Sequence, residues 1–179
     1  MKRVTLHDKS FRLLLEERVI DEEIQRMAAE INRDLQGETP LFLAVLNGAF
    51  MFASDLLKRV ELEGAEVAFI RVASYAGTAS TGEVRELIGL TEEIAGRTVV
   101  LVEDIVDTGR SLFHLKEMLQ GHAPLQVKIA TLFYKPDALE HDLTVDYAGI
   151  ALENDFVVGR GLDYDGLGRN LPDLYVIEE

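Results

Sequence analysis

The sequence predicts an α/β domain built around a parallel sheet, and three observations support this fold class. Residues 98–102 form an unbroken run of β-branched residues and leucine, which is typical of a strand covered on both faces. Residues 21–36 carry apolar side chains at helical spacing, and a second apolar run follows at 41–46. The chain has 179 residues, of which 47% are hydrophobic, so we expect one domain, 1–179, with a single core.

The remaining elements follow from the same patterns. The predicted helix over 21–36 has acidic residues in its first turn and Gly37 after its end, and Thr39-Pro40 precedes the strand over 41–46. Other apolar runs predict further strands, and a helix is expected after the central run. These segments are strands at 67–72, 127–133 and 175–177, short apolar segments at 147–152 and 156–159, a helix at 112–120 and a loop at 165–170.

Composition excludes several classes of protein. The formal net charge of −14 argues against nucleic acid or an anionic membrane as the main partner, because either would need a basic face. The absence of cysteine excludes disulfides and suits a reducing cytoplasm, and four histidines leave little material for a structural zinc site. The start of the chain is too polar for a secretory leader, and its apolar runs are too short to cross a bilayer.

Acidic residues and a glycine turn follow the central apolar run. Glu103 and Asp104 stand where the strand is expected to end, which is where open α/β sheets bind ligands. Adjacent carboxylates are good acceptors for the vicinal hydroxyls of a ribose. Gly109 allows a tight turn, and the free N–H groups of the next helix, with the hydroxyls of Thr108 and Ser111, can bind a phosphate. The combination indicates a ribose 5-phosphate site.

Simpler interpretations of this segment remain open. Asp107-Thr108-Gly109 can serve only as a helix N-cap and turn, and Glu103-Asp104 can be solvated acids at a strand end. The Walker A pattern is absent from the sequence, which argues against a P-loop nucleotidase.

Residues 99–111 closely resemble the phosphoribosyl pyrophosphate (PRPP) motif of type I phosphoribosyltransferases, and the Glu103-Asp104 pair resembles the hypoxanthine branch of that family. The resemblance extends over most of the chain. It implies a doubly wound parallel sheet with a small hood made from the N-terminal segment and the C-terminal tail. The phosphate loop is then Thr108, Gly109, Arg110 and Ser111. Asp107, between the ribose acids and this loop, is expected to be the general acid/base at N7 of the purine.

Two further loops gain expected roles from the resemblance. The turn at Asn47 and Gly48 matches the loop that holds pyrophosphate through backbone N–H groups, although the family often has lysine where this chain has Asn47. Ser74 and Tyr75 resemble the start of a lid that closes over the active site. From the residues alone, the first loop can be an Asn-Gly turn without a ligand, and the second can be a β-hairpin connection to 84–90.

The C-terminal part resembles the purine-binding segment of the hypoxanthine branch. By that likeness Phe156 stacks on the base, the Val157 backbone meets its Watson-Crick edge, and Lys135 reaches its 6-oxo group. Asp163 is expected to help bind magnesium, and Arg169 to contact pyrophosphate. Without the resemblance, Lys135 would be a surface lysine, Phe156 a core residue and Asp163 a loop acid. Arg160 departs from the family, which commonly has an aromatic residue at its position.

The implied reaction is purine salvage, in which hypoxanthine or guanine and PRPP give IMP or GMP and pyrophosphate. A magnesium ion, bound by Glu103, Asp104 and Asp163, is expected because pyrophosphate must leave a site that already holds these three acids and Asp107. The resemblance also implies a homo-oligomer, a dimer or tetramer. Two alternatives stay open: a PRPP-sensing regulator without catalysis, and a phosphoribosyltransferase for another base.

Overall fold

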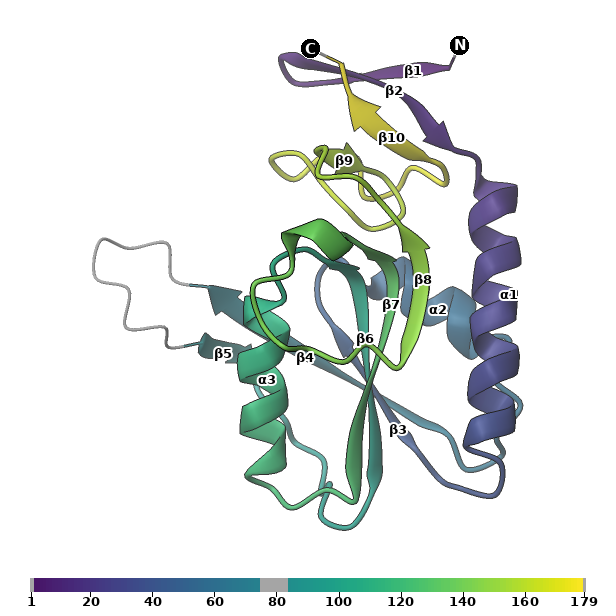
Figure 1. Cartoon of the computed structure of the whole chain (residues 1–179), viewed down its shortest axis with the longest axis vertical. Coiled ribbons are helices and arrows are strands. Elements are labelled where there is room, and N and C mark those ends of the chain that lie inside the picture. The colour runs from purple at the N-terminus through teal and green to yellow at the C-terminus, as the bar shows by residue number, and fades with distance from the viewer. Residues whose placement is uncertain (1, 75–83, 179) are drawn as a thin grey trace.

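The computed structural model describes residues 2–74 and 84–178, without the side chains of residues 73, 74 and 84–88. Its centre is a six-stranded sheet with the strand order β5-β4-β3-β6-β7-β8 (Figure 1). These strands are β3 (Leu41–Val45), β4 (Glu66–Ser74), β5 (Val84–Ile88), β6 (Thr98–Val106), β7 (Gln126–Tyr134) and β8 (Tyr147–Ala151). Neighbouring strands pair in parallel, except β4 and β5, which are antiparallel.

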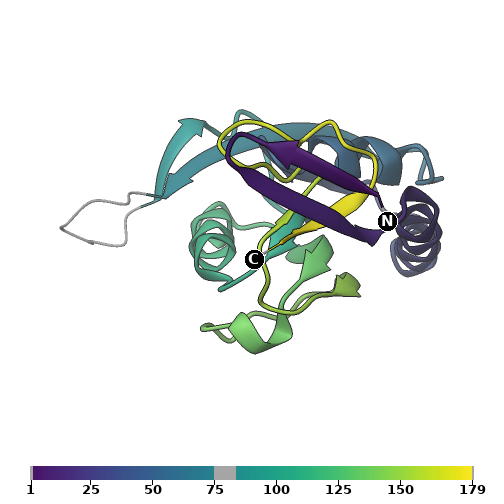
Figure 2. The same ribbon diagram turned by 90° about the horizontal axis from the view of Figure 1, so that it is seen from above.

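A second, four-stranded antiparallel sheet lies at one end of the molecule. Its order is β1-β2-β10-β9, and its strands are β1 (Arg3–Leu6), β2 (Lys9–Leu15), β9 (Val157–Val158) and β10 (Leu174–Ile177). Seen from above, the N-terminal hairpin and β10 cover the end of the central sheet (Figure 2). Phe11, Val158 and Tyr175 form its small core. This sheet is the hood that the family resemblance implied.

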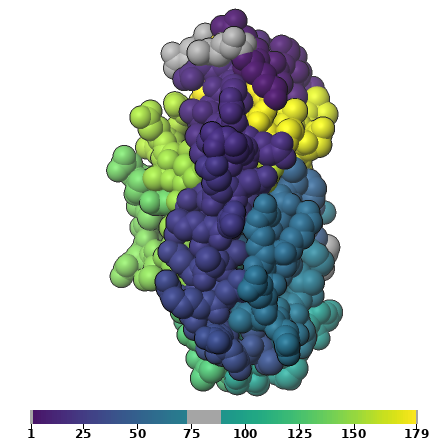
Figure 3. Space-filling model, turned by 90° about the vertical axis from the view of Figure 1, so that its right-hand side faces the viewer, coloured from purple at the N-terminus to yellow at the C-terminus, as the bar shows by residue number. Residues whose placement is uncertain are grey.

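Helices cover both faces of the central sheet, which confirms the doubly wound fold class. Helices α1 (Glu17–Asp34) and α2 (Phe50–Leu57) pack on one face, and α3 (Arg110–Gln120) packs on the other. Strand β6 serves both layers, because Val100 and Val102 point to the first face while Val99 and Leu101 point to the second. Figure 3 shows α1 lying along one side of the molecule beside the segment that contains α2.

Helix α1 begins at Glu17, whereas the sequence pattern predicted a start at residue 21. The first turn has no side-chain cap from its own N-cap residue, Glu16. Instead, the backbone N–H of Glu17 donates to Oδ1 of Asp173 at 2.8 Å. A cap from the far end of the chain therefore extends the helix by one turn beyond what local signals predict.

Strand β6 is also longer than predicted. Glu103 and Asp104 lie inside the strand, not after it, because β6 keeps its parallel pairing with β7 up to Val106 and Tyr134. The next residue of β7, Lys135, donates its backbone N–H to the carbonyl of Val106 at 2.9 Å. No helix in the described part of the chain has the length and apolar character needed to span a membrane.

Candidate active site

The site begins at the carboxyl end of β6, where a pocket of about 220 Å³ is lined by residues 103–112. Glu103 and Asp104 lie side by side in its wall. Burial, reinforced by the neighbouring Asp104 carboxylate, raises the pKa of Glu103 well above its ordinary value. Burial also raises the pKa of Asp104, although hydrogen bonds and the positive charge of Arg169 act in the opposite direction. The two acids therefore form a site that favours a partner able to donate hydrogen bonds or supply positive charge.

The predicted phosphate loop lines the same pocket. Gly109 has φ +75° and is the N-cap residue of α3, which has no side-chain cap within the described structure. Gly109 is therefore the N-cap within the predicted cap-and-turn segment Asp107-Thr108-Gly109, and the N–H groups that follow Arg110 in the first turn of α3 can bind an anion. The guanidinium of Arg110 pairs with Glu140 at 2.9 Å. The backbone N–H of Arg110 donates to the Thr108 hydroxyl oxygen at 3.4 Å.

The Asn47-Gly48 turn lies directly against the acid pair. A Cβ atom added at Gly48 would stand 1.7 Å from Oδ2 of Asp104, so only glycine permits this approach. A Cβ added at Gly161 would stand 2.0 Å from the carbonyl oxygen of Gly48. The peptide bond between Leu46 and Asn47 is cis, which the sequence did not indicate. Three segments that are distant in sequence, carrying Gly48, Asp104 and Gly161, are therefore stacked in direct contact.

Lys135 follows β7 and is 7% exposed, which overturns its interpretation as a surface lysine. Its ammonium donates to Oδ2 of Asp107 at 3.0 Å, across the carboxyl ends of β6 and β7. Asp107 itself stays exposed. The structure thus brings together the two residues that were expected at N7 and at the 6-oxo group of the purine.

The C-terminal residues lie where the hood meets the central sheet. Phe156 is 46% exposed, so its interpretation as a core residue is wrong. It rests against Phe11 and Tyr164, with ring centroids 6.3 Å and 5.9 Å away. Val157 is buried and pairs with Val176. One face of the hood therefore offers an aromatic ring that its neighbours hold in place.

Asp163 and Arg169 are paired with each other at 2.7 Å. Asp163 also accepts from the backbone N–H of Gly166, and Arg169 donates to the carbonyl of Gly161 at 2.7 Å. The loop that contains Asp163 and Arg169 is thereby hydrogen-bonded to Gly161, which packs on Gly48. Ser74 is the last residue of β4, while Tyr75 lies outside the described residues, so the lid stays an expectation. Strands β4 and β5 pair antiparallel, with Ser74 opposite Val84.

Comparison with known proteins identifies this arrangement. The family model of the phosphoribosyl transferase domain matches residues 14–165. The chain belongs to the phosphoribosyltransferase family. A hypoxanthine-guanine phosphoribosyltransferase of Streptococcus thermophilus (strain CNRZ 1066) is 39% identical over 169 residues, covering 94% of this chain and 93% of that protein.

Solved phosphoribosyltransferase structures share the fold. A hypoxanthine phosphoribosyltransferase of Staphylococcus aureus matches with a TM-score of 0.89 and 36% identity, over 93% of this chain and 91% of that one. The hypoxanthine phosphoribosyltransferase of Trypanosoma cruzi, solved in complex with the product IMP, matches with a TM-score of 0.88 and 32% identity, over 98% and 97% of the two chains.

The donor set of this phosphoribosyltransferase suits a divalent cation that is shared with the substrate. Glu103 and Asp104 offer carboxylate oxygens, the ligands that magnesium prefers, and burial raises the pKa of both groups. Asp163 is already engaged by Arg169, and no three acidic or histidine side chains of the described residues converge as a metal site. A metal here would complete its coordination with substrate oxygens and water.

One buried residue was not expected from the sequence. Arg160 is 2% exposed and contacts carboxylates on α1 and α2. The sequence shows only that Arg160 departs from the family pattern, because an arginine beside two glycines carries no local signal of burial.

Proposed function

We propose that the protein is a hypoxanthine-guanine phosphoribosyltransferase, which transfers the 5-phosphoribosyl group of PRPP to hypoxanthine or guanine and releases pyrophosphate. The single observation that carries this proposal is the contact between Asp107 and Lys135. N7 and O6 are neighbouring atoms on one edge of a 6-oxopurine. A carboxylate and an ammonium that lie 3.0 Å apart can contact N7 and O6 of one purine at the same time.

The other predicted site residues would bind the remaining parts of the substrates. The phosphate loop at Gly109 would bind the 5′-phosphate, and Glu103 with Asp104 would accept from the ribose hydroxyls. Phe156 would stack on the base, with the Val157 backbone at its Watson-Crick edge. The Asn47-Gly48 turn and Arg169 would hold pyrophosphate. Magnesium, held by substrate oxygens and water and by individual carboxylates among Glu103, Asp104 and Asp163, would supply positive charge to offset the pyrophosphate.

The chemistry that these residues support is a substitution at C1′ of the ribose. N9 of the purine forms a bond to C1′ while the bond from C1′ to the pyrophosphate oxygen breaks. The purine proton at N7 passes to Asp107, which is exposed and acts as the general base. Lys135 donates to O6 and thereby orients the ring. Atoms and charge balance, because the proton leaves the purine as the new N–C bond forms.

We also propose a homo-oligomer. Ala68 and Ile70 of β4 face the core on the α3 side, so Val67 and Phe69 point to the other face of the sheet. These two side chains are 47% and 46% exposed. Exposed apolar neighbours of this kind mark association surfaces. Sedimentation of the purified protein distinguishes a monomer from a dimer or tetramer.

The proposed activity is tested by incubating the purified protein with PRPP, magnesium and a panel of hypoxanthine, guanine, xanthine and adenine. Formation of IMP and GMP is expected, with very little AMP. Transfer only to another base would establish a different phosphoribosyltransferase. PRPP binding by calorimetry without transfer to any base would indicate the regulator.

The selectivity is expected to depend on Lys135. An ammonium has three donors and no acceptor, so it suits a 6-oxo oxygen but opposes the donors of the adenine 6-amino group. Sites of this kind can discriminate by about 10⁴- to 10⁵-fold. Lys135→Gln should lower kcat/KM for hypoxanthine and narrow its ratio to adenine. Lys128→Gln, at the other end of β7, is the control; an unchanged ratio in Lys135→Gln would place the origin of selectivity at the Val157 backbone.

A further inference from the structure

Arg160 stands between the two glycines that shape the purine-side loop. Its backbone has φ +52°, and Gly159 and Gly161 on either side have φ above +100°. The Arg160 N–H donates to the carbonyl of Leu171 at 2.8 Å, and the Gly161 N–H donates to that of Arg169 at 3.0 Å. These bonds fix the backbone, and the side chain then leads away from the pocket toward the helices.

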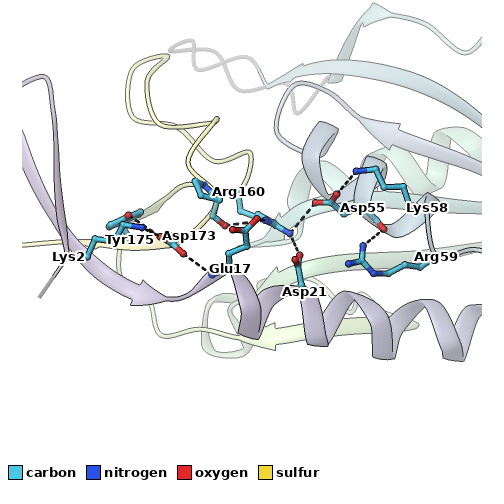
Figure 4. A network of polar contacts seen from close by, with 10 residues as sticks. Lys2, Glu17, Asp21, Asp55, Lys58, Arg59, Arg160, Asp173 and Tyr175 are labelled. Atoms are coloured by element: carbon cyan, nitrogen blue, oxygen red, sulfur yellow. Dashed lines mark hydrogen bonds and ion pairs between the residues drawn. The ribbon is translucent and has the colours of Figure 1, made fainter.

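The guanidinium of Arg160 lies among three carboxylates on two helices (Figure 4). It pairs with Asp21 of α1, with Glu17 of α1 at 3.5 Å and with Asp55 of α2 at 3.1 Å. It also donates to the carbonyl of Pro172 at 3.2 Å. The side chain is 2% exposed, while the carboxylates around it keep access to solvent. A planar guanidinium with several fixed donors holds such partners in one geometry, which a lysine cannot do.

These contacts connect the two loops of the pyrophosphate side. Helix α2, which carries Asp55, starts directly after the Asn47-Gly48 turn. The residue after Arg160 is Gly161, whose Cα packs on the carbonyl of Gly48 and whose own carbonyl accepts from Arg169. Arg160 therefore holds the Gly48 turn through its helix and the Arg169 loop through its own backbone.

We propose that Arg160 is a positioning residue that sets the spacing between the Asn47-Gly48 turn and the Asp163–Arg169 loop, and thereby the affinity for the pyrophosphate group of PRPP. The inference rests on the proposed function of this site. Arg160 does not reach the pocket itself, so its effect acts through backbone placement. The purine and the 5′-phosphate are held by other residues, at Lys135, Phe156 and Gly109, and their binding should be largely unaffected.

The test compares four variants with the unmodified protein. Arg160→Met removes the charge and keeps an unbranched side chain, and Arg160→Lys keeps the charge without the planar guanidinium and its several fixed donors. Of the ion pairs made by Arg160, Asp55→Asn weakens only the one with α2, so this variant remains informative where Arg160→Met does not fold. Lys58→Met is its control, because Lys58 is the other cation paired with Asp55, at 3.0 Å.

A separate control measures the effect of lost stability. Asn32 joins α1 to the end of α2, accepting from Glu61 N–H and donating to the Arg59 carbonyl. Asn32→Ala therefore weakens helix packing without touching Arg160. For every variant the KM values for PRPP and hypoxanthine, the Kd values for magnesium pyrophosphate and IMP, and Tm are measured.

The expected result is a selective loss at the pyrophosphate side. In Arg160→Met the KM for PRPP and the Kd for pyrophosphate should rise about tenfold, a coupling of the usual size for a residue that acts through others. The KM for hypoxanthine and the Kd for IMP should stay within about twofold. Arg160→Lys should be intermediate, Asp55→Asn should follow Arg160→Met, and both controls should keep the original PRPP affinity.

Three results would overturn the inference: an unchanged KM for PRPP in Arg160→Met or in Asp55→Asn, an equal rise in KM for both substrates, or the same rise in Asn32→Ala. A failure of the proposed function is recognised separately, because the unmodified protein would then form neither IMP nor GMP.

Discussion

Asp107 is the residue on which the proposed proton transfer depends. Asp107→Asn keeps the size of the side chain and removes the proton acceptor, so kcat should fall by roughly 10²- to 10⁴-fold. Binding of PRPP should be largely kept, because the phosphate loop and ribose acids are untouched. Steady-state kinetics and calorimetry measure the two quantities. Asp137→Asn, an exposed acid just after Lys135, is the control. Near-normal turnover in Asp107→Asn would remove Asp107 from this role.

Glu103 should make the stability of the ligand-free protein depend on pH. Its pKa is raised by burial and by Asp104, so its contribution to stability is complete below its ordinary value of 4.5 and is lost as the pH rises through the folded-state pKa. At higher pH the buried, ionised Glu103 therefore destabilises the folded state, by about 1.4 kcal/mol for each unit by which its pKa is raised. Glu103→Gln removes this destabilisation.

The variant should therefore have a higher Tm than the unmodified protein near pH 8, and the difference should shrink as the pH approaches 4.5. Thermal melts across this range measure it. A difference that is constant with pH, or a lower Tm of the variant at pH 8, would mean that the buried, ionised Glu103 does not destabilise the fold. The same substitution should lower activity, because the variant loses a ribose acceptor.

At the level of single residues, the sequence predicted the chemistry of the central motif and not the partners of its side chains. Glu103, Asp104 and Gly109 could be assigned because they are contiguous with a strand and a helix. The pairing of Lys135 with Asp107, and of Arg110 with Glu140, joins residues that are 28 and 30 positions apart. Such pairs depend on strand register and on loop path, which no local pattern encodes.

The junction between β6 and α3 depends on the conformation of Gly109. Its φ of +75° is strained for any residue with a Cβ, and an added Cβ would stand 3.2 Å from Leu139 and 3.3 Å from Leu143. Gly109→Val should therefore shift the phosphate loop and weaken PRPP and IMP binding while the central sheet stays folded. Calorimetry and circular dichroism measure these effects. Gly37→Val is the control, because Gly37 also has positive φ but lies in open space after α1. Unchanged nucleotide affinity in Gly109→Val would place the 5′-phosphate elsewhere.

The start of α1 depends on Asp173. Burial opposes ionisation of Asp173, but hydrogen bonds from Lys2 and the Glu17 N–H outweigh it and lower its pKa. Asp173→Ala leaves the Glu17 N–H and the Tyr175 hydroxyl without this acceptor, which should cost about 1–3 kcal/mol. The loss should be present above the ordinary value of 3.8 and should diminish as the pH falls below it.

Denaturant unfolding at several pH values measures this loss, with the exposed Asp142→Ala as the control. Equal stability of Asp173→Ala and the unmodified protein near neutral pH would show that the first turn of α1 does not need this cap.

Among the elements, strands with continuous apolar runs were predicted to within a few residues, as β3 and β7 show. The β1–β2 hairpin was not predicted as strands, although Val4 and Leu6 alternate with polar residues before a turn. Strand β1 has only four residues and lies at the edge of its sheet, so the alternation covers too few positions to predict a strand. The extra turn of α1 could not be predicted, because its cap comes from Asp173 at the other end of the chain.

For the whole molecule, the resemblance predicted the arrangement of a doubly wound sheet under a hood, and composition alone predicted only a single α/β core. The first five residues of β6 are all buried, and their side chains enter the two cores alternately, because helices cover both faces of the sheet. The stacking of Gly48, Asp104 and Gly161 is a property of the assembled fold, since each segment comes from a different part of the chain. Glycine at these positions could be noted in the sequence, but the close approach that requires it could not.

The pairing of β2 with β10 also has a consequence for biosynthesis. Lys2 and Asp173, which are joined in the hood, are 171 positions apart. At ribosomal speeds of about 5–20 residues per second, roughly 10–30 s separate the synthesis of the two strands. During that interval α1, the parallel strands and the phosphate loop can already assemble, while the β1–β2 hairpin still lacks its central neighbour. The central sheet can thus assemble before the hood, whose sheet is completed only after β10 has been synthesised.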